Sequence, residues 1–184
     1  MKDPCQIRLG GSGGQGLITA GVILAEAGQL DGKNVVQTQT YGPEARLGSS
    51  KAEVILSAGR IGYPQVTIPD VLLCMSQEAA RKYMPQVHPS TLVILDSTNI
   101  GPEVTGKGQV HRMAITETAV AVGSKVVANA VALGAMNELA GLVTPENLRE
   151  AVLARVPERF RDLNARAIEA GAKLAQAAAK TVGV

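Results

Sequence analysis

A glycine-rich segment near the start of the chain places the strongest constraint on its fold. Residues 10–16 read Gly-Gly-Ser-Gly-Gly-Gln-Gly, between an apolar run typical of a strand (6–9) and an Ala- and Leu-rich run typical of a helix from residue 17. Glycine tolerates positive φ and lets other atoms approach the backbone closely. The spacing Gly-x-Gly-x-x-Gly at 11–16 therefore predicts a strand–turn–helix unit whose helix N-terminus presents unpaired N–H groups.

Two interpretations of this glycine loop remain open. It is either a tight turn without a ligand, or a site for a phosphate-bearing ligand or a partner chain. A dinucleotide site also needs an acidic residue at the end of the second strand, where it binds the ribose. The second predicted strand, 35–40, reads Val-Val-Gln-Thr-Gln-Thr and has none, which counts against NAD and FAD. No Lys followed by Ser or Thr ends the loop, so it is not a P-loop.

Strand-like and helix-like patterns alternate along the rest of the chain, which favours an α/β fold. Further strands are predicted at 52–57, 71–75, 92–95 and 110–115, and further helices at 77–84, 126–142, 145–155 and after Pro157. The continuous apolar runs 71–75 and 92–95 are typical of strands buried on both faces. We expect a three-layer, mostly parallel, Rossmann-like sheet flanked by helices, with one antiparallel hairpin allowed.

Composition narrows the classes of function. The 184 residues suit one domain, and a net charge of +2 with 2% aromatic residues argues against nucleic-acid partners. Two Cys cannot hold an iron–sulfur cluster, and His88 and His111 lack a matching acidic motif, so no metal site is expected. Neither a secretory signal nor a membrane-spanning run is seen. These features predict a cytoplasmic protein without a membrane partner.

A second loop follows the second predicted strand and begins Tyr-Gly-Pro-Glu-Ala-Arg at residues 41–46. Ligands of open α/β sheets bind where the strands end, so the two loops are expected to lie side by side. Arg46 offers a bidentate fork for a phosphate or a carboxylate. Glu44 is either a base or simply the ionic partner of Arg46. The alternative for the whole loop is a polar surface turn.

Two polar residues in apolar surroundings are further candidates. Asn129 lies in the apolar helix predicted at 126–142, where a buried amide needs a hydrogen-bond partner. It either braces the glycine loop, which is favoured, or reaches another subunit. Asp96 ends a buried strand and is expected to cap the turn that follows, with contact to a ligand as the alternative.

Three segments, taken together, are informative beyond their composition. They are Ile-Arg-Leu-Gly-Gly-Ser-Gly-Gly-Gln-Gly (7–16), Gln-Thr-Gln-Thr-Tyr-Gly-Pro-Glu-Ala-Arg (37–46) and Asn-Ala-Val-Ala-Leu-Gly (129–134). With them the chain resembles the gamma subunit, or gamma domain, of the 2-oxoacid:ferredoxin oxidoreductases, and the tail 156–171 is also similar. The resemblance implies one gamma-type domain over residues 1–184. One departure is Leu47, where many members of that family have Gly.

Enzymes of this family decarboxylate a 2-oxoacid on thiamine diphosphate, pass electrons through iron–sulfur clusters to ferredoxin, and transfer the acyl group to coenzyme A. The resemblance implies that this chain is a non-redox accessory subunit, inactive when isolated, beside alpha, beta and delta-type subunits that carry the other cofactors. Residues 35–46 look most like the 2-oxoglutarate branch, although pyruvate, 2-oxoisovalerate and indolepyruvate enzymes have related gamma parts. The alternative is a stand-alone nucleotide-binding Rossmann-like protein.

The same resemblance implies that this chain shapes the coenzyme A side of the active site and contributes no catalytic residue. The residues expected to face the cofactor are Gly11, Ser12, Gly13, Gly14, Gln15, Gly16, Tyr41, Glu44, Arg46 and Asn129.

Overall fold

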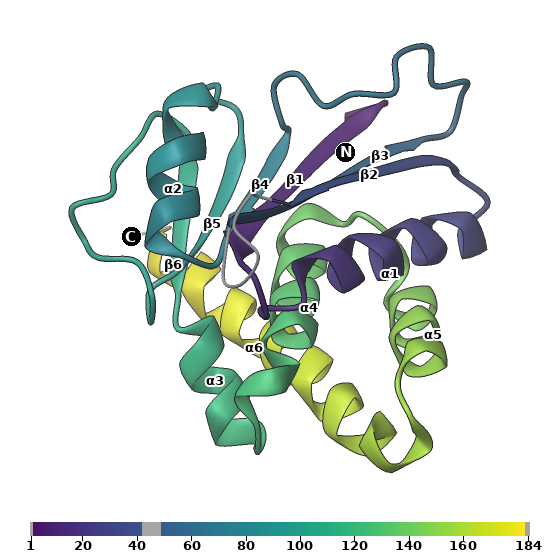
Figure 1. The fold of residues 1–184 in the computed structure, drawn as a ribbon, viewed down its shortest axis with the longest axis vertical. Coiled ribbons are helices and arrows are strands. Elements are labelled where there is room, and N and C mark those ends of the chain that lie inside the picture. The colour runs from purple at the N-terminus through teal and green to yellow at the C-terminus, as the bar shows by residue number, and fades with distance from the viewer. Residues whose placement is uncertain (1, 42–48, 183–184) are drawn as a thin grey trace.

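A computed structural model describes residues 2–41 and 49–182. These residues form a six-stranded sheet in the order β2-β3-β1-β4-β5-β6 (Figure 1). Strands β1, β4, β5 and β6 run parallel, whereas β3 lies antiparallel between β1 and β2. The strands are β1 (Cys5–Ser12), β2 (Asn34–Tyr41), β3 (Ser49–Ser57), β4 (Val71–Cys74), β5 (Leu92–Asp96) and β6 (Gln109–Met113).

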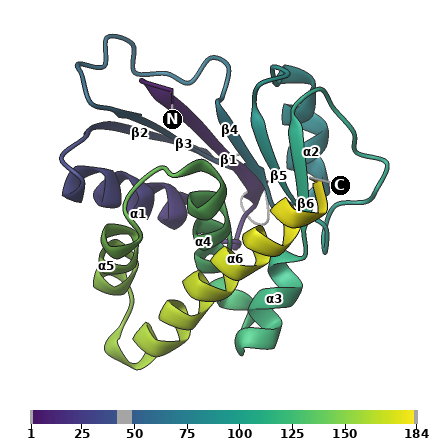
Figure 2. The same cartoon turned by 180° about the vertical axis from the view of Figure 1, so that it is seen from behind.

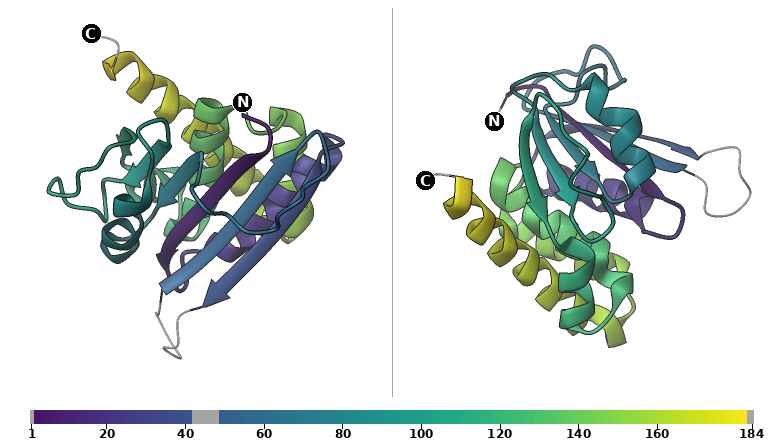
Figure 3. Two further views of the ribbon diagram at one scale, coloured as in Figure 1. Left: turned by 90° about the horizontal axis from the view of Figure 1, so that it is seen from above. Right: turned by 90° about the vertical axis from the view of Figure 1, so that its left-hand side faces the viewer.

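Helices cover the two faces of the sheet unequally. Helices α1, α3, α4, α5 and α6 lie on one face and α2 lies on the other, as the two opposite views show (Figures 1 and 2). The side view in Figure 3 shows the same separation into layers. The helices are α1 (Leu17–Leu30), α2 (Gln77–Tyr83), α3 (Ile115–Val122), α4 (Ala128–Ala140), α5 (Pro145–Arg155) and α6 (Arg161–Val182), with 3-10 turns at η1 (Met84–Gln86), η2 (Lys125–Val127) and η3 (Glu158–Phe160).

Local sequence signals set several of the helix ends. The hydroxyl of Ser76 accepts a hydrogen bond from the amide of Ala79 and so caps α2. The hydroxyl of Thr144 caps α5 in the same way, and Pro145 occupies the first position of that helix, where its missing N–H costs nothing. Both helices therefore begin where the sequence predicts them.

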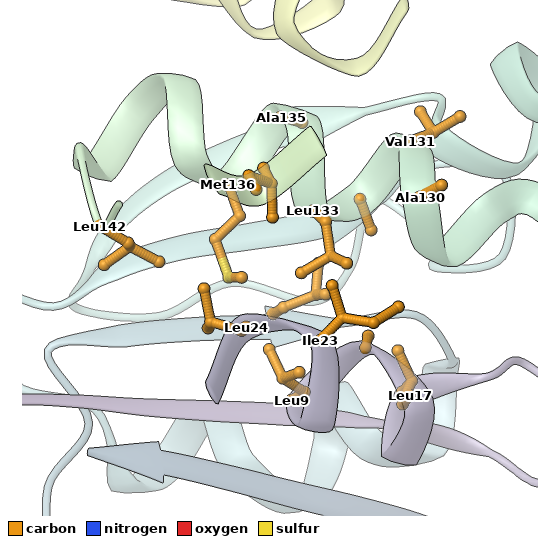
Figure 4. Packing of buried hydrophobic residues seen from close by; sticks show 14 of the residues in the cluster. Leu9, Leu17, Ile23, Leu24, Ala130, Val131, Leu133, Ala135, Met136 and Leu142 are labelled. Atoms are coloured by element: carbon orange, nitrogen blue, oxygen red, sulfur yellow. The ribbon is translucent and has the colours of Figure 1, made fainter. Parts of the chain in front are cut away.

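Two apolar clusters hold the layers together. Strands β4 and β5 contribute to both, because Leu73 and Ile94 face the larger helical layer while Leu72 and Val93 face α2. This double burial explains the continuous apolar runs of these strands. Figure 4 shows the larger cluster, in which side chains of α1 such as Leu24 point toward α4.

Helices α4 and α6 cross at two glycines. A Cβ atom at Gly134 would meet the carbonyl oxygen of Ile168, and one at Gly171 would meet the carbonyl oxygen of Val131. The two backbones are therefore in direct contact, and any side chain at either position would push the helices apart.

The predicted fold class is confirmed, with local differences. The predicted strand 110–115 ends at Met113, and the segment 115–122, which was not predicted as a helix of its own, forms α3. This segment has β-branched residues and no side-chain cap, so its helical state depends on packing rather than propensity. Strand β3 begins at Ser49 instead of residue 52. Within the described ranges, no helix is long and apolar enough to cross a membrane.

Candidate functional site

The glycine loop lies at the edge of the sheet where β1 ends. Strand β1 continues through Ser12, so the turn itself comprises only residues 13–16, with α1 starting at Leu17. Gly14 and Gly16 have positive φ values of 89° and 71°, which an L side chain rarely adopts. These two glycines are required by the backbone of the turn.

The first glycines of the motif serve a different purpose. Gly10 and Gly11 lie within β1, and both are buried. A Cβ atom at Gly10 would lie 2.7 Å from the ring of Tyr83, and one at Gly11 would collide with the side chains of Gln15 and Leu17. Gly11 therefore packs inside the chain, and the part of the motif open to a ligand is the turn 13–16.

Gln15 holds the turn in shape. Its Oε1 accepts a hydrogen bond from the amide of Ser12 at 2.7 Å, and its Nε2 donates to the carbonyl oxygen of Met75 at 2.8 Å. The side chain thus joins the end of β1 to the residue that follows β4. Because both ends of the amide are used within the chain, the structure places Gln15 as a positioning residue for the loop.

Asn129 braces the loop from α4, as the sequence favoured. Its Nδ2 donates to the carbonyl oxygen of Gly16 at 3.4 Å, over a separation of 113 residues, while its Oδ1 accepts from the amide of Ala130. Asn129 lies in the first turn of α4, so the N-terminal ends of α1 and α4 meet at the loop. Both helix ends direct partial positive charge toward the same place.

The turn presents unpaired donors. The backbone amides of Gly13, Gly14 and Gly16 donate to no atom in the described ranges. Gly14 is exposed, and nothing lies within 4 Å of the position its Cβ would take. Amides of this kind beside a helix N-terminus suit the oxygens of a phosphate or diphosphate.

The second loop emerges from the same edge of the sheet. Tyr41 at the end of β2 pairs with Ser50, which pairs with Gly11, so the ends of three neighbouring strands are aligned. The hydroxyl of Ser50 donates to the carbonyl oxygens of Gly11 and Ser12. The expectation that the two loops start side by side is therefore met at their strand ends. Glu44 and Arg46, and the side chain of Tyr41, lie outside the described residues.

Asp96 is fully committed to structure. Its buried carboxylate accepts hydrogen bonds from the amide of Thr98, from Asn99 Nδ2 at 2.7 Å, and from the amide and hydroxyl of Thr116. The predicted cap of the following turn is thus confirmed. The sequence did not reveal Thr116, which reaches Asp96 from the start of α3, 20 residues further along.

A buried ion pair between Arg8 and Glu53 was not predicted from the sequence. Arg8 on β1 donates to Glu53 on β3 at 2.7 Å and to the carbonyl oxygen of Val66, and both charged side chains are almost fully buried. The Arg8 guanidinium also lies over the ring of Tyr83 at 5.4 Å. Arg8 thereby holds the β3–β4 connection against the sheet, away from the end of the sheet that carries the glycine loop. Alternation of residues on β1 gave no signal for it, because a lone Arg in a strand is usually exposed.

Burial shifts the pKa values of both cysteines and of one histidine. Burial raises the pKa of the Cys5 and Cys74 thiols to about 12, so both remain protonated and unreactive at neutral pH. Burial also lowers the pKa of His111. In the part of the chain that the structure describes, no group of three or more His, Cys, Asp or Glu side chains could hold a metal ion.

Comparison with known proteins gives a consistent result. The family model described as "Pyruvate ferredoxin/flavodoxin oxidoreductase" matches residues 6–174. The chain is 40% identical over 175 residues to 2-oxoglutarate synthase subunit KorC of Methanocaldococcus jannaschii, an alignment that covers 93% of this chain and 94% of that protein.

Solved structures agree with the sequence relatives. The gamma subunit of a keto/oxoacid ferredoxin oxidoreductase from Geobacter sulfurreducens superposes with a TM-score of 0.85 at 46% identity, covering 95% of this chain and 99% of that one. A 2-oxoglutarate:ferredoxin oxidoreductase from Magnetococcus marinus, solved with 2-oxoglutarate, coenzyme A and succinyl-CoA bound, gives 0.86 at 26% identity. The alignment covers 96% of this chain but only 32% of that longer chain.

Proposed function

The chain belongs to the pyruvate ferredoxin/flavodoxin oxidoreductase family, and from this premise we propose that it is the gamma subunit of a 2-oxoglutarate:ferredoxin oxidoreductase. The complex would convert a 2-oxoacid, coenzyme A and two oxidised ferredoxins into acyl-CoA, CO2, two reduced ferredoxins and a proton. The 2-oxoglutarate synthase relative and the gamma-subunit structure, both matched over nearly their full lengths, support this assignment.

Residues 1–184 act in this proposal as one gamma-type domain that binds coenzyme A. The observation that carries the proposal is that the amides of Gly13, Gly14 and Gly16, where the N-termini of α1 and α4 meet, donate to no atom of the described residues. These donors fit the diphosphate of coenzyme A. Gln15 and Asn129 keep the turn in the shape that holds them. Arg46 and Glu44 follow from the neighbouring strand end and remain predicted contacts.

The other cofactors do not fit this chain. Its two cysteines are buried in the core, and no cluster of metal-ligating side chains exists in the described ranges, so neither an iron–sulfur cluster nor the metal that accompanies thiamine diphosphate has ligands here. We assign thiamine diphosphate and the clusters to alpha, beta and delta-type subunits, through which ferredoxin would be reduced. Thiamine diphosphate, when bound there, supplies the carbanion chemistry of decarboxylation. A cytoplasmic location suits two free thiols.

Nothing in the fold favours the alternative of a stand-alone nucleotide-binding protein. In a dinucleotide-binding unit the first two parallel strands are neighbours joined by a helix. Here β3 lies antiparallel between β1 and β2, so that unit is not formed.

The test uses the native complex, purified through a tag on this chain. We expect co-purification of subunits that carry thiamine diphosphate and iron–sulfur clusters, and reduction of methyl viologen with 2-oxoglutarate in preference to pyruvate, 2-oxoisovalerate and indolepyruvate. Preference for another of these 2-oxoacids would contradict the assignment of 2-oxoglutarate as the substrate. Recovery of the chain alone, without activity, would contradict the subunit assignment.

Hydrogen exchange tests the coenzyme A site separately. Saturating coenzyme A is expected to slow amide exchange in residues 13–17 of the complex, because bound phosphate oxygens would accept from those N–H groups. Desulfo-coenzyme A, which cannot react, should give the same protection. Unchanged exchange in this segment, with the complex active, would place coenzyme A elsewhere.

A further inference from the structure

Strand β2 is an open edge of the sheet. Among the described residues it has one neighbour, β3, and all eight of its residues pair with that strand without a bulge. The strand reads Asn-Val-Val-Gln-Thr-Gln-Thr-Tyr, with no proline and no charged residue. Proteins usually protect a long edge with charges, prolines, bulges or a covering segment, because its free backbone groups attract another strand. Strand β2 carries none of the first three.

The side on which each backbone group points follows from β1. The carbonyl oxygen of Gly10 accepts a hydrogen bond from the amide of Met75, on the β4 side of β1. Neighbouring residues of a strand direct their N–H and C=O groups to opposite sides, so Leu9 points toward β3. Leu9 is paired with Ala52, which must therefore point toward β1.

The same alternation carries across β3. Since Ala52 points toward β1, Glu53 points toward β2, where it is paired with Thr38. Thr38 is therefore bonded within the sheet, and its neighbours Gln37 and Gln39 direct their N–H and C=O groups outward. No backbone amide of β2 donates outside the strand ladder to any atom in the described ranges.

The free edge is complementary to itself. We propose that β2 pairs antiparallel with β2 of a second copy of this chain, around a two-fold axis through Gln37. In this register Gln37 faces its own copy and Val35 faces Gln39, so the outward-pointing residues at the centre of the strand meet one another. Val36 faces Thr38 on the other side of the sheet. None of these pairs contains a charge, and uncharged β-branched and amide pairs stabilise neighbouring strands.

Helix α1 can lie beside its copy in this pairing. It packs mainly over β3, where Gly21 meets Ala52 and Gly28 meets Leu56, and partly over β2, where Gly28 also meets Val35. The two α1 helices would be between two and three strand spacings apart, roughly 9–14 Å, a range that includes the usual separation of about 8–10 Å between packed helix axes. The axis at Gln37 is four residues from Tyr41, or roughly 13 Å. The two glycine loops therefore point away from the axis in opposite directions and stay open.

The purified chain provides the test. We expect sedimentation equilibrium to show a monomer–dimer equilibrium, and amide exchange at Val35, Gln37 and Gln39 to slow as the dimer forms. Gln39→Pro removes an outward N–H and leaves the β2–β3 ladder intact, so it should weaken the dimer at least about tenfold. Gln39→Ala keeps that N–H and should dimerise like the unaltered chain.

Two charged variants of Gln37 give a second test that does not depend on introducing a proline. Gln37→Lys and Gln37→Glu each place like charges across the axis, so each variant alone should be monomeric, whereas an equimolar mixture should form a one-to-one dimer. A chain that stays monomeric at every concentration overturns the proposal. So does a dimer that survives Gln39→Pro, or an edge that becomes protected only when other subunits are added, which would assign β2 to a different partner.

Discussion

The glycine loop and the α4–α6 crossing both depend on glycine, for opposite reasons. At the crossing, the space beside Gly134 and Gly171 is filled by the backbone of the other helix. At the loop, nothing of the described chain lies within 4 Å of the Cβ position of Gly14, and no described atom accepts from the amides of Gly13, Gly14 and Gly16. The first pair of glycines serves the chain itself. The space at Gly14 is open, as the proposed coenzyme A site requires.

This difference separates stability from function. Filling the crossing should mainly damage folding, because the added atoms meet the backbone of the other helix. Filling the loop should cost little stability and change the binding of coenzyme A.

The largest effect is expected at the crossing. Gly171→Ala places a methyl group on the carbonyl oxygen of Val131 and should lower the free energy of unfolding by about 3 kcal/mol, measured by urea denaturation. Gly62→Ala is the control, because that position is open and should change stability by less than about 0.5 kcal/mol. Equal effects of the two substitutions would show that the helices can separate without cost.

Gln15 contributes both to the stability of the chain and to the shape of the glycine loop. Gln15→Ala removes the hydrogen bonds to Ser12 and Met75 and should cost about 2 kcal/mol of stability. In the complex, the variant should raise KM for coenzyme A with little change in kcat, because the turn loses its shape while the reacting groups remain. A stability loss without any change in KM would make Gln15 purely structural.

A substitution in the glycine loop should change coenzyme A binding more than it changes stability. Gly14→Ala should cost about 1 kcal/mol of stability, because of its positive φ, and should raise KM for coenzyme A about tenfold. Gly32→Ala is a matched control, since Gly32 also has positive φ (74°) and open surroundings but lies in the turn between α1 and β2. If both variants raise KM equally, the loop is not the coenzyme A site.

The smallest effect is expected at Asp31, a carboxylate held by hydrogen bonds, and it should depend on pH. Burial alone would raise the pKa of Asp31, but hydrogen bonds from Asn147 and Thr144 and the charge of Lys33 hold it below its ordinary value. Asp31 therefore stabilises the chain above a pH of about 4, and this contribution is lost as pH falls through the lowered pKa. Asp31→Asn should flatten this part of the pH–stability curve.

Gly171→Ala provides the contrast for that titration. Because the crossing involves no titratable group, its stability loss should be the same on both sides of pH 4. A loss that varies with pH in parallel with the Asp31 contribution would show that the two regions are coupled through the contact between α5 and α6, where Arg149 pairs with Glu169.

Parts of the fold and of the site could be predicted from the sequence, because they depend on interactions between residues close together in the chain. The apolar runs of β4 and β5, the caps at Ser76 and Thr144, and the strand–turn–helix at the glycine loop each depend on neighbours within a few residues. The brace by Asn129 was also foreseen, because a single amide in an apolar helix must find a partner.

Other features depended on contacts between distant segments. Helix α3 has weak intrinsic propensity. The sequence allowed an antiparallel hairpin but did not indicate that β3 would lie between β1 and β2. Nor did it distinguish Gln15 as a clamp from Gln15 as a ligand contact, because its partner Met75 is 60 residues away.

The sequence by itself determined which segments are strands buried on both faces, where several helices begin, and that a glycine turn joins β1 to α1. Periodicity, capping and backbone freedom are properties of short segments, so they can be recognised without the rest of the chain. Only the tertiary structure decided which glycines are filled by another backbone and which face open space. That distinction depends on what lies beside each Cα in the folded chain, and residues far apart in sequence supply it.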